Sequence, residues 1–385
     1  MREPQYIATT LFGLENILAG ELEELGAEDI LTMNRAVGFS GSQAIMYKVN
    51  IGARTAMRIL KNIHSFRAFN EDELYKNVFN IPWEDHFSIK KTFMINSAVS
   101  SPRFTHSHFV SQKVKDAIAD RFRKITTLRP SVDTENPDIV INIHISNDVV
   151  NVALDSSGEP LFKRGYRVAQ YIAPLNEVLA AGMLKMTGWE GNGNLIDPMC
   201  GSGTLSIEAA LMAKKIPPGI FREKFGFMSW NDYDESLYKK LQEHMLNPVE
   251  FNGSIFASDI SDEAISLTKR NIDKALLRDF IRVQKADFRS FNPPPEGGII
   301  ILNPPYGERL KDIELENFYK EIGDTFKKKY PGYQSWILSA NIPALKHIGL
   351  HPDKKHELVN GSLKCKFLKY LIYEGSKKPK KNLEI

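Results

Sequence analysis

Hydrophobic positions in the second half of the chain alternate between two periodicities. Short apolar runs bounded by polar residues are typical of buried parallel strands, and they lie at 195–196, 255–257, 281–283, 298–302, 336–339 and 367–373. Segments with apolar residues at helical spacing follow several of them, at 175–184, 204–216 and 264–274. Strands that alternate with helices predict a doubly wound α/β sheet over residues 166–385.

The first 165 residues follow a less regular pattern. Residues 1–65 predict a small α/β unit with a strand at 6–8, a helix at 14–25, a strand pair near 36–40 and a second helix at 44–60. From residue 66 to 165 the main feature is a hairpin, because alternating isoleucines at 139–145 precede an Asn147-Asp148 turn and a strand at 149–154. We expect a docking or structural role for the first unit.

A basic run precedes this hairpin. Between Ser101 and Pro130 there are seven basic and two acidic residues, which give a local charge of +5. A charge run is often only the solvated face of a helix. A basic helix mounted on a sheet, with Phe104 and Phe109 near its start, also suits a phosphate backbone.

Composition excludes several classes of protein. The 385 residues are 42% hydrophobic and 25% charged, as in ordinary globular proteins, and the net charge of +3 neither favours nor excludes a nucleic-acid partner. Two cysteines without CxxC pairing indicate no metal knuckle and no disulfide framework. The first residues lack the apolar core of a signal peptide, and no apolar run is long enough to cross a bilayer. We therefore expect a cytoplasmic protein without metal or membrane association.

The segment 194–205 predicts a ligand site. Asp197 ends a strand, Gly201-Ser202-Gly203 forms a tight turn, and Thr204 opens a helix. A phosphate-binding loop would need a lysine after the turn, and a dinucleotide fingerprint would need a third glycine at Ser206. An ammonium group beside a carboxylate fits better, as in S-adenosylmethionine, although plain strand–helix packing remains the alternative for this motif alone.

Three acidic residues follow successive predicted strands. Asp197 can hold an ammonium group, Asp259 can accept from ribose hydroxyls, and Asp287 can accept from an adenine amine. Each alone is a common helix cap or loop residue. Together they predict one crevice for S-adenosylmethionine, because the carboxyl ends of parallel strands meet at one edge.

The segment Asn303-Pro304-Pro305-Tyr306-Gly307 follows a fourth strand. Two prolines remove backbone donors and fix the chain, which leaves an amide oxygen and a bare carbonyl as acceptors. Such a pair can hold both N–H groups of an exocyclic base amine while Tyr306 stacks on a base taken out of its stack. We predict Asn303, Pro304, Pro305 and Tyr306 as the catalytic residues.

These motifs resemble those of class I amino-methyltransferases that modify exocyclic base amines. The segments 173–177, 217–219 and 360–365, with Ala153-Leu154-Asp155 and Arg164-Gly165-Tyr166-Arg167, resemble the THUMP-containing branch, which includes the bacterial 23S rRNA guanine-N2 methyltransferase. Some members are labelled N6-adenine-specific DNA methylases. The resemblance implies a ferredoxin-like domain at 1–65, a THUMP RNA-binding domain at 66–165 and a Rossmann-like methyltransferase domain at 166–385. Long forms of the rRNA enzyme carry a second methyltransferase domain, whose activity we expect to be absent here.

The resemblance and the residues together predict the site. The expected cofactor contacts are Asp197, Cys200, Gly201, Gly203, Asp259, Asp287 and Asn303, with Cys200 as a small packing residue in the turn rather than a nucleophile. The expected RNA contacts are Arg103, Lys113, Lys115, Arg121, Lys124, Arg164 and Arg167. Our preferred hypothesis is a methyltransferase acting on guanine N2 of 23S rRNA. The alternatives are a tRNA guanine-N2 methyltransferase, a DNA adenine methylase and a non-enzymatic RNA-binding ribosome assembly factor.

Overall fold

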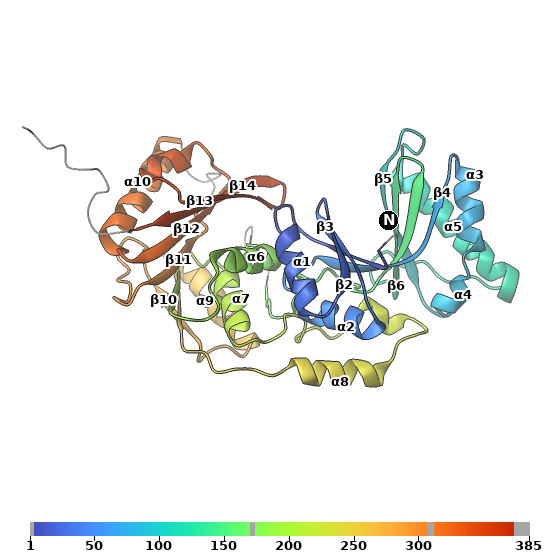
Figure 1. The fold of residues 1–385 in the computed structure, drawn as a ribbon, viewed down its shortest axis with the longest axis horizontal. Helices are drawn as coiled ribbons and strands as arrows, with labels where there is room; N and C mark the ends of the chain where they lie inside the picture. Colours follow the sequence, from blue (N-terminus) through green and yellow to red (C-terminus); the bar gives the residue numbers. More distant parts are fainter. Residues whose placement is uncertain (1–3, 170–173, 306–311, 373–385) are drawn as a thin grey trace, which may run out of the picture. The chain divides into compact units, whose positions relative to one another are not determined.

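The computed structural model describes residues 4–169, 174–305 and 312–372, in two compact units. One unit is formed by 1–165 and 217–247, and the other by 166–216 and 248–385. Each unit contains a seven-stranded sheet with helices packed against it (Figure 1). The predicted α/β class is confirmed.

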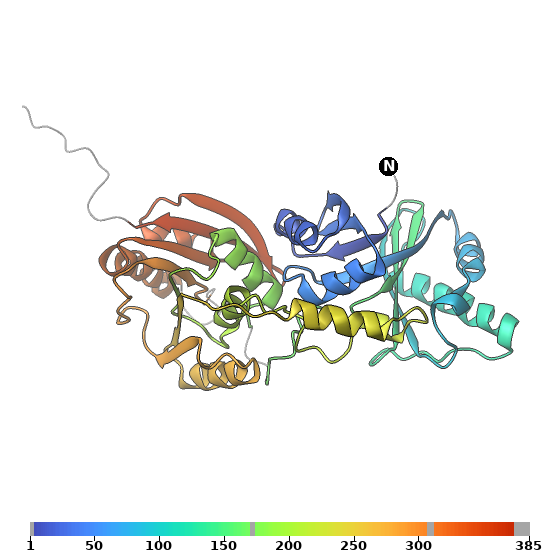
Figure 2. The same cartoon turned by 60° about the horizontal axis from the view of Figure 1, so that its bottom comes forward.

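The sheet of the first unit has the order β2-β3-β1-β4-β7-β6-β5. Its strands are β1 (Tyr6–Thr9), β2 (Glu28–Met33), β3 (Ala36–Ser40), β4 (Arg58–Arg67), β5 (Phe93–Ser100), β6 (Ile139–Ser146) and β7 (Val149–Asp155). Its helices are α1 (Glu15–Glu24), α2 (Gln43–Gly52), α3 (Glu71–Asn80), α4 (Trp83–His86), α5 (Ser107–Thr126) and α8 (Glu235–Met245), with a 3-10 turn η1 (Gly226–Ser229). The basic run forms α5, which packs beside α3 (Figures 1 and 2).

One expectation about this unit needs correction, and one predicted boundary falls within a strand. The helix predicted over 44–60 ends at Gly52, and the chain from Arg58 onward forms β4. Strand β4 pairs with β1 on one side and with β7 on the other, so the predicted boundary between residues 65 and 66 lies inside a strand shared by both predicted domains. Residues 1–165 therefore share one continuous sheet rather than two separate ones.

The aromatic insert, residues 217–247, lies within the range 166–385 predicted for the methyltransferase domain. Residues 217–247 belong instead to the first unit, where Phe225, Phe227 and Trp230 are buried in the same hydrophobic core as strands β1 and β4. The rings of Phe225 and Phe227 stack with their centroids 5.3 Å apart. The insert therefore completes the core of the first unit.

The sheet of the second unit has the order β10-β9-β8-β11-β12-β14-β13. Its strands are β8 (Asn194–Asp197), β9 (Ser254–Asp259), β10 (Ile281–Lys285), β11 (Gly298–Leu302), β12 (Tyr333–Ser339), β13 (Lys354–Asn360) and β14 (Leu363–Leu371). Its helices are α6 (Glu177–Thr187), α7 (Thr204–Ala213), α9 (Asp262–Lys274) and α10 (Asp312–Lys329), with a 3-10 turn η2 (Ala344–Ile348). Helix α10 and η2 share a hydrophobic cluster with β11, β12 and β14.

The strand order places the carboxyl ends of five strands at one edge. Strands β10, β9, β8, β11 and β12 are parallel, and the β13–β14 hairpin joins β12 in the antiparallel sense. The order reverses between β8 and β11, and the crevice outside such a reversal is where open α/β sheets bind ligands. Strand β11 has the predicted bounds, and its residues 299–302 are buried as expected for a central strand.

Candidate active site

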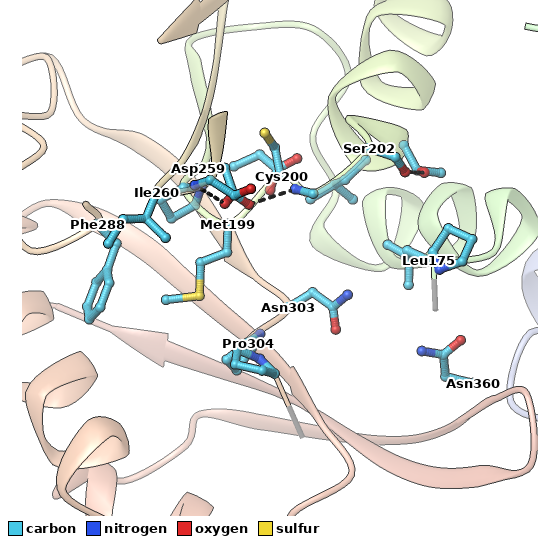
Figure 3. Close-up of a pocket in the computed structure, with 18 of the residues that line it drawn as sticks. Leu175, Met199, Cys200, Ser202, Asp259, Ile260, Phe288, Asn303, Pro304 and Asn360 are labelled. Carbon is cyan, nitrogen blue, oxygen red and sulfur yellow. Dashed lines mark hydrogen bonds between the residues drawn. The ribbon is translucent and has the colours of Figure 1, made fainter. Parts of the chain in front are cut away.

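A cavity of about 1040 Å³ opens along this carboxyl edge. Asp197 is the last residue of β8 and Asp259 the last of β9, while Asp287 follows β10 and Asn303 follows β11 directly. All four line the cavity. The structure thus brings together the strand-end residues that the sequence analysis expected to converge, and Figure 3 shows Asp259 and Asn303 on opposite sides of the space.

The turn between β8 and α7 depends on two glycines. Gly201 has φ +54° and Gly203 has φ +78°, in the left-handed region that side chains disfavour. A Cβ atom at Gly203 would lie 2.8 Å from Cγ2 of Thr268. The Thr268 hydroxyl donates to the Gly201 carbonyl at 2.8 Å. The turn therefore presents bare backbone to the cavity and is held from behind by α9.

Asp197 is the most perturbed carboxyl of the cavity. It is 2% exposed, and its Oδ2 accepts a hydrogen bond of 2.9 Å from the Ser206 hydroxyl. Burial raises the pKa of Asp197 to about 7, the charge of Asp259 adds to this rise, and Ser206 opposes it. A buried carboxylate of this kind gains most from a cationic ligand group placed beside it.

Asp259 links the glycine turn to its own strand end. Its Oδ2 accepts from the Gly201 backbone N–H and its Oδ1 from the Ser261 N–H, both at 3.0 Å (Figure 3). These bonds fix the plane of the carboxylate at the cavity wall. The remaining lone pairs of each oxygen can still accept from a ligand hydroxyl.

Asp287 is oriented by its neighbour Arg289. The Arg289 backbone N–H donates to Oδ1 at 2.8 Å, and the guanidinium donates to both carboxylate oxygens. These hydrogen bonds lower the pKa of Asp287. Ile260 and Phe288, each directly after a strand-end aspartate, also line the cavity, and Ile260 is 65% exposed. Neither apolar residue is among the predicted site residues, although a position directly after a strand-end acidic residue is a usable signal.

The proline turn lies beyond β11. Asn303, Pro304 and Pro305 line the cavity, and Met199 of the glycine turn faces Pro304 across it (Figure 3). Tyr306, which was predicted to stack on a base, lies outside the described residues. The part of the turn that the structure describes places an amide group and two prolines on the same edge as the three aspartates.

Arg164 and Arg167 were predicted as RNA contacts, and for Arg164 the structure contradicts this. Arg164 is 2% exposed and donates to the backbone carbonyls of Leu161 and Arg54. Its guanidinium is therefore occupied inside the first unit.

Arg167 joins the walls of the cavity instead of facing outward. Its guanidinium is ion-paired with Glu177, and it donates to Ser202 Oγ at 3.1 Å and to Thr204 Oγ1 and the Leu175 carbonyl, both at 2.8 Å. Ser202, Thr204 and Leu175 all line the cavity. The sequence alone could not distinguish this role of Arg167 from an RNA contact, because the partners of Arg167 lie up to 37 residues away in the chain.

The basic run of α5 is partly neutralised by acids outside it. Arg121 forms a two-point ion pair with Glu84, and Lys113 pairs with Asp72 at 3.4 Å. Lys115 pairs with Asp116 at 3.1 Å, but Asp116 belongs to the run and is already counted in its charge. The local charge of +5 therefore overstates the charge presented to a partner.

Three cations of this region lie over aromatic rings. Arg103 lies over Phe69, Lys113 over Tyr75 and Lys124 over Phe79, at 5.1–5.4 Å from the ring centroids. RNA binding by Arg103, Lys113, Lys115, Arg121 and Lys124 stays a prediction.

Cys200 is buried at the wall of the cavity. Burial raises the pKa of the Cys200 thiol, which disfavours a reactive thiolate and agrees with a packing role. Over the described ranges, no group of three or more His, Cys, Asp or Glu residues is placed to hold a metal ion. No helix of the part that the structure describes is long and apolar enough to span a membrane.

The residues present fit S-adenosylmethionine. Gly201 of the turn lines the cavity, the buried carboxylate of Asp197 suits the ammonium group, and Asp259 is placed for hydroxyls. Gly203, predicted as a cofactor contact, is not among the lining residues, and its lack of a Cβ serves packing against Thr268 of α9. Ile260 offers an apolar surface beside them. A cavity of about 1040 Å³ also exceeds most single-ligand pockets, which leaves room for a second ligand.

The strand order, the glycine turn and the acidic strand ends define a class I methyltransferase. The family comparison agrees, since residues 164–369 match the model described as "RMKL-like, methyltransferase domain". The chain belongs to this family. Residues 68–155 match the THUMP domain and residues 5–60 the RlmL ferredoxin-like domain.

Individual relatives extend over nearly the whole chain. It is 39% identical to the Synechocystis protein slr0064, whose curated name assigns it provisionally to the RNA methyltransferases, over 96% of this chain and 97% of that protein. It is 40% identical to the ribosomal RNA large subunit methyltransferase K/L of Methylococcus capsulatus, over 95% of this chain. The chain spans 51% of that enzyme and about half the length of the other K/L relatives.

A solved structure shows the same fold with a bound product. The crystal structure of SMU.472, a protein provisionally named a methyltransferase and complexed with SAH, superimposes with a TM-score of 0.86 at 28% identity. The match covers 98% of this chain and 100% of that one.

Proposed function

We propose that this protein is an S-adenosylmethionine-dependent RNA methyltransferase acting on guanine N2 of 23S rRNA. The observation that carries the proposal is the single cavity in which Asn303 and the two prolines share one sheet edge with Asp197 and Asp259. The K/L relatives act, by name, on large-subunit ribosomal RNA, and SMU.472 binds SAH. The THUMP match at 68–155 supports an RNA substrate.

Each residue has a distinct task in this proposal. Bound S-adenosylmethionine supplies an electrophilic methyl group. Asp197 neutralises the ammonium end of that ligand, Asp259 accepts from its ribose hydroxyls, and the backbone at Gly201, which lines the cavity, allows close approach. Asn303 Oδ1 and the Pro304 carbonyl accept the two N–H groups of the base amine. Holding both protons draws the nitrogen lone pair out of conjugation with the ring and toward the methyl group. As the N–C bond forms and the S–C bond breaks, the nitrogen becomes acidic, so that no strong general base is needed to remove its proton.

Transfer of labelled methyl groups tests the proposal. The protein is incubated with tritiated S-adenosylmethionine and separate pools of unmodified 23S rRNA, tRNA and DNA. Label is expected in 23S rRNA, and mass spectrometry of nucleosides should identify N2-methylguanosine. Label in tRNA alone would move the substrate to tRNA, label in DNA alone would overturn the RNA assignment, and no label with any pool would favour a non-enzymatic role.

A matched pair of variants tests the proline turn. Asn303→Ala should lower kcat by about 100-fold or more, because one of the two acceptors of the amine is lost, while RNA affinity stays near the wild-type value. Asn317→Ala, an exposed asparagine of α10, controls for loss of an amide elsewhere in the same unit. Equal kcat in Asn303→Ala and the wild type would remove Asn303 from the reaction.

A further inference from the structure

The cavity extends well beyond the residues assigned to the cofactor. Asp197, Asp259 and Asp287 lie on the β8, β9 and β10 side of β11. On the other side, the lining continues along the loop after β12 and the turn of the β13–β14 hairpin, with Asn341, Pro343, Asn360, Gly361, Ser362 and Leu363. A cofactor held by the three aspartates leaves this second part for the substrate.

The second part of the cavity has no charged lining residue among those that the structure describes. With Ala340, which also lines it, this part consists of two amides, a hydroxyl, a proline, a glycine, a leucine and an alanine. The described residues of this part offer no cation to a phosphate or a carboxylate. The lining suits a neutral, flat group with hydrogen-bonding edges, as a nucleobase is.

Two of these residues share one face of the hairpin. Asn360 is paired with Leu363 in the register of β13 and β14, so that only Gly361 and Ser362 lie between them. Residues directly opposite one another in an antiparallel pair project on the same side of the sheet. Leu363 is 44% exposed, and Figure 3 shows the Asn360 carboxamide and the Asn303 carboxamide bordering the same space. The hairpin thus presents an apolar surface and an amide together.

We propose that Asn360 reads the edge of the target base and selects guanine, while Leu363 packs against its face. The inference rests on the proposed function. When the guanine N2 amine is held at Asn303, the neighbouring groups on the same edge are the N1–H donor and the O6 acceptor. A carboxamide matches both, because its oxygen accepts from N1–H and its NH2 donates to O6. Adenine held by its N6 amine offers only the N1 acceptor and a C–H group.

The test uses a base that keeps the reacting N2 amine but lacks the N1–H donor and the O6 acceptor that Asn360 would contact. The RNA fragment that contains the modified nucleotide is prepared with guanosine or with 2-aminopurine at that position, since 2-aminopurine retains the N2 amine but lacks O6 and the N1 proton. The ratio of kcat/KM for guanosine over 2-aminopurine is measured in the wild type, Asn360→Ala and Leu363→Ala. The ratio measured for each variant is then compared with the ratio of the wild type. This comparison removes the intrinsic difference in reactivity between the two bases, because that difference is the same for every enzyme.

Asn360→Ala should lower this ratio by about 5- to 150-fold, the usual discrimination by one bidentate contact. Leu363→Ala should lower kcat/KM for both bases and leave the ratio unchanged. Asn360→Leu, of similar volume but without donors or acceptors, should behave like Asn360→Ala, and SAH affinity near the wild-type value checks that each variant is folded. An unchanged ratio in both Asn360 variants, with guanosine still methylated, overturns the inference alone. Absence of transfer to any RNA overturns the proposed function as well.

Discussion

The raised pKa of Asp197 predicts that the active site destabilises the protein above neutral pH. The perturbation that tests this is Asp197→Asn, which keeps the shape of the side chain and removes the titrating group. The amide can still accept from Ser206, whose hydroxyl lies 2.9 Å from Oδ2 in the wild type. Any cost of misplacing the new NH2 group is independent of pH, so the informative quantity is how the difference between variant and wild type changes with pH.

The size of the effect follows from the two pKa values. The pKa of Asp197 is about 7 in the folded protein against an ordinary value of 3.8. Because the folded value is the higher one, the group costs nothing below pH 4, and the cost grows as the pH rises to 7 and is then constant. Each pKa unit corresponds to about 1.4 kcal/mol, so the full cost is on the order of 4 kcal/mol. About 2 kcal/mol of it develops between pH 5.5 and pH 8.

The assay compares urea unfolding of the wild type and Asp197→Asn at pH 5.5 and pH 8, without ligand. Hydrogen exchange of β8 and α7 reports the unit that contains the residue. The free energy of unfolding of Asp197→Asn, relative to the wild type, should rise by about 2 kcal/mol from the lower to the higher pH. Asp279→Asn, at an exposed position of the same unit, controls for loss of a carboxylate.

The affinity for SAH should rise with pH, whereas Asp197 lowers the stability of the folded protein as the pH rises. The ammonium group of SAH gains from an ionised Asp197, so wild-type affinity should fall by up to about tenfold per pH unit below 7. Asp197→Asn should bind more weakly at pH 8 and lose this pH dependence, as measured by titration calorimetry. A relative stability that stays constant within about 0.5 kcal/mol across the pH range would refute the buried carboxylate reasoning.

Three further predictions concern packing and positioning. Gly323→Ala should destabilise the second unit by about 3 kcal/mol, because a Cβ would lie 1.8 Å from the Ile348 carbonyl oxygen. Gly20→Ala should stabilise α1 by about 0.5–1 kcal/mol, because a Cβ there would meet nothing within 4 Å. Urea unfolding measures both changes. Leu276→Gly should raise the melting temperature, since Leu276 has φ +57° after α9 and is 80% exposed. Arg167→Ala should weaken SAH binding about tenfold or more and leave RNA affinity unchanged. Weaker RNA binding at unchanged SAH affinity would instead support the predicted RNA contact of Arg167.

The convergence of the acidic strand ends on one cavity could be predicted because its signals are local. An apolar strand, an acidic residue and a glycine turn fall within a dozen residues at 194–205, and Asp259 follows its strand in the same way. The parallel order of the strands then makes convergence at one edge a geometric necessity. No knowledge of remote contacts was required.

The errors arose where remote contacts decide the structure. Arg58-Ile59-Leu60 fits a helical continuation of α2 in sequence, but pairing with β1 and β7 makes it a strand. The burial of Arg164 depends on the Arg54 carbonyl, 110 residues earlier in the chain. The aromatic insert fills the core of a unit whose other residues end at 165. Residue type and periodicity carry no information about such partners.

The same distinction separates chemistry from specificity in this enzyme. Local motifs mark Asp197, Asp259 and Asn303, so the class of reaction can be predicted from the sequence. Asn360 has no motif that reports which base edge it faces, because its place beside the cavity depends on the pairing of β13 with β14 and of β14 with β12. A change in this hairpin would alter the preferred base while leaving every catalytic motif intact. Under the proposed role of Asn360, the choice of base is therefore encoded in the long-range register of the sheet, on the side of β11 opposite Asp197, Asp259 and Asp287.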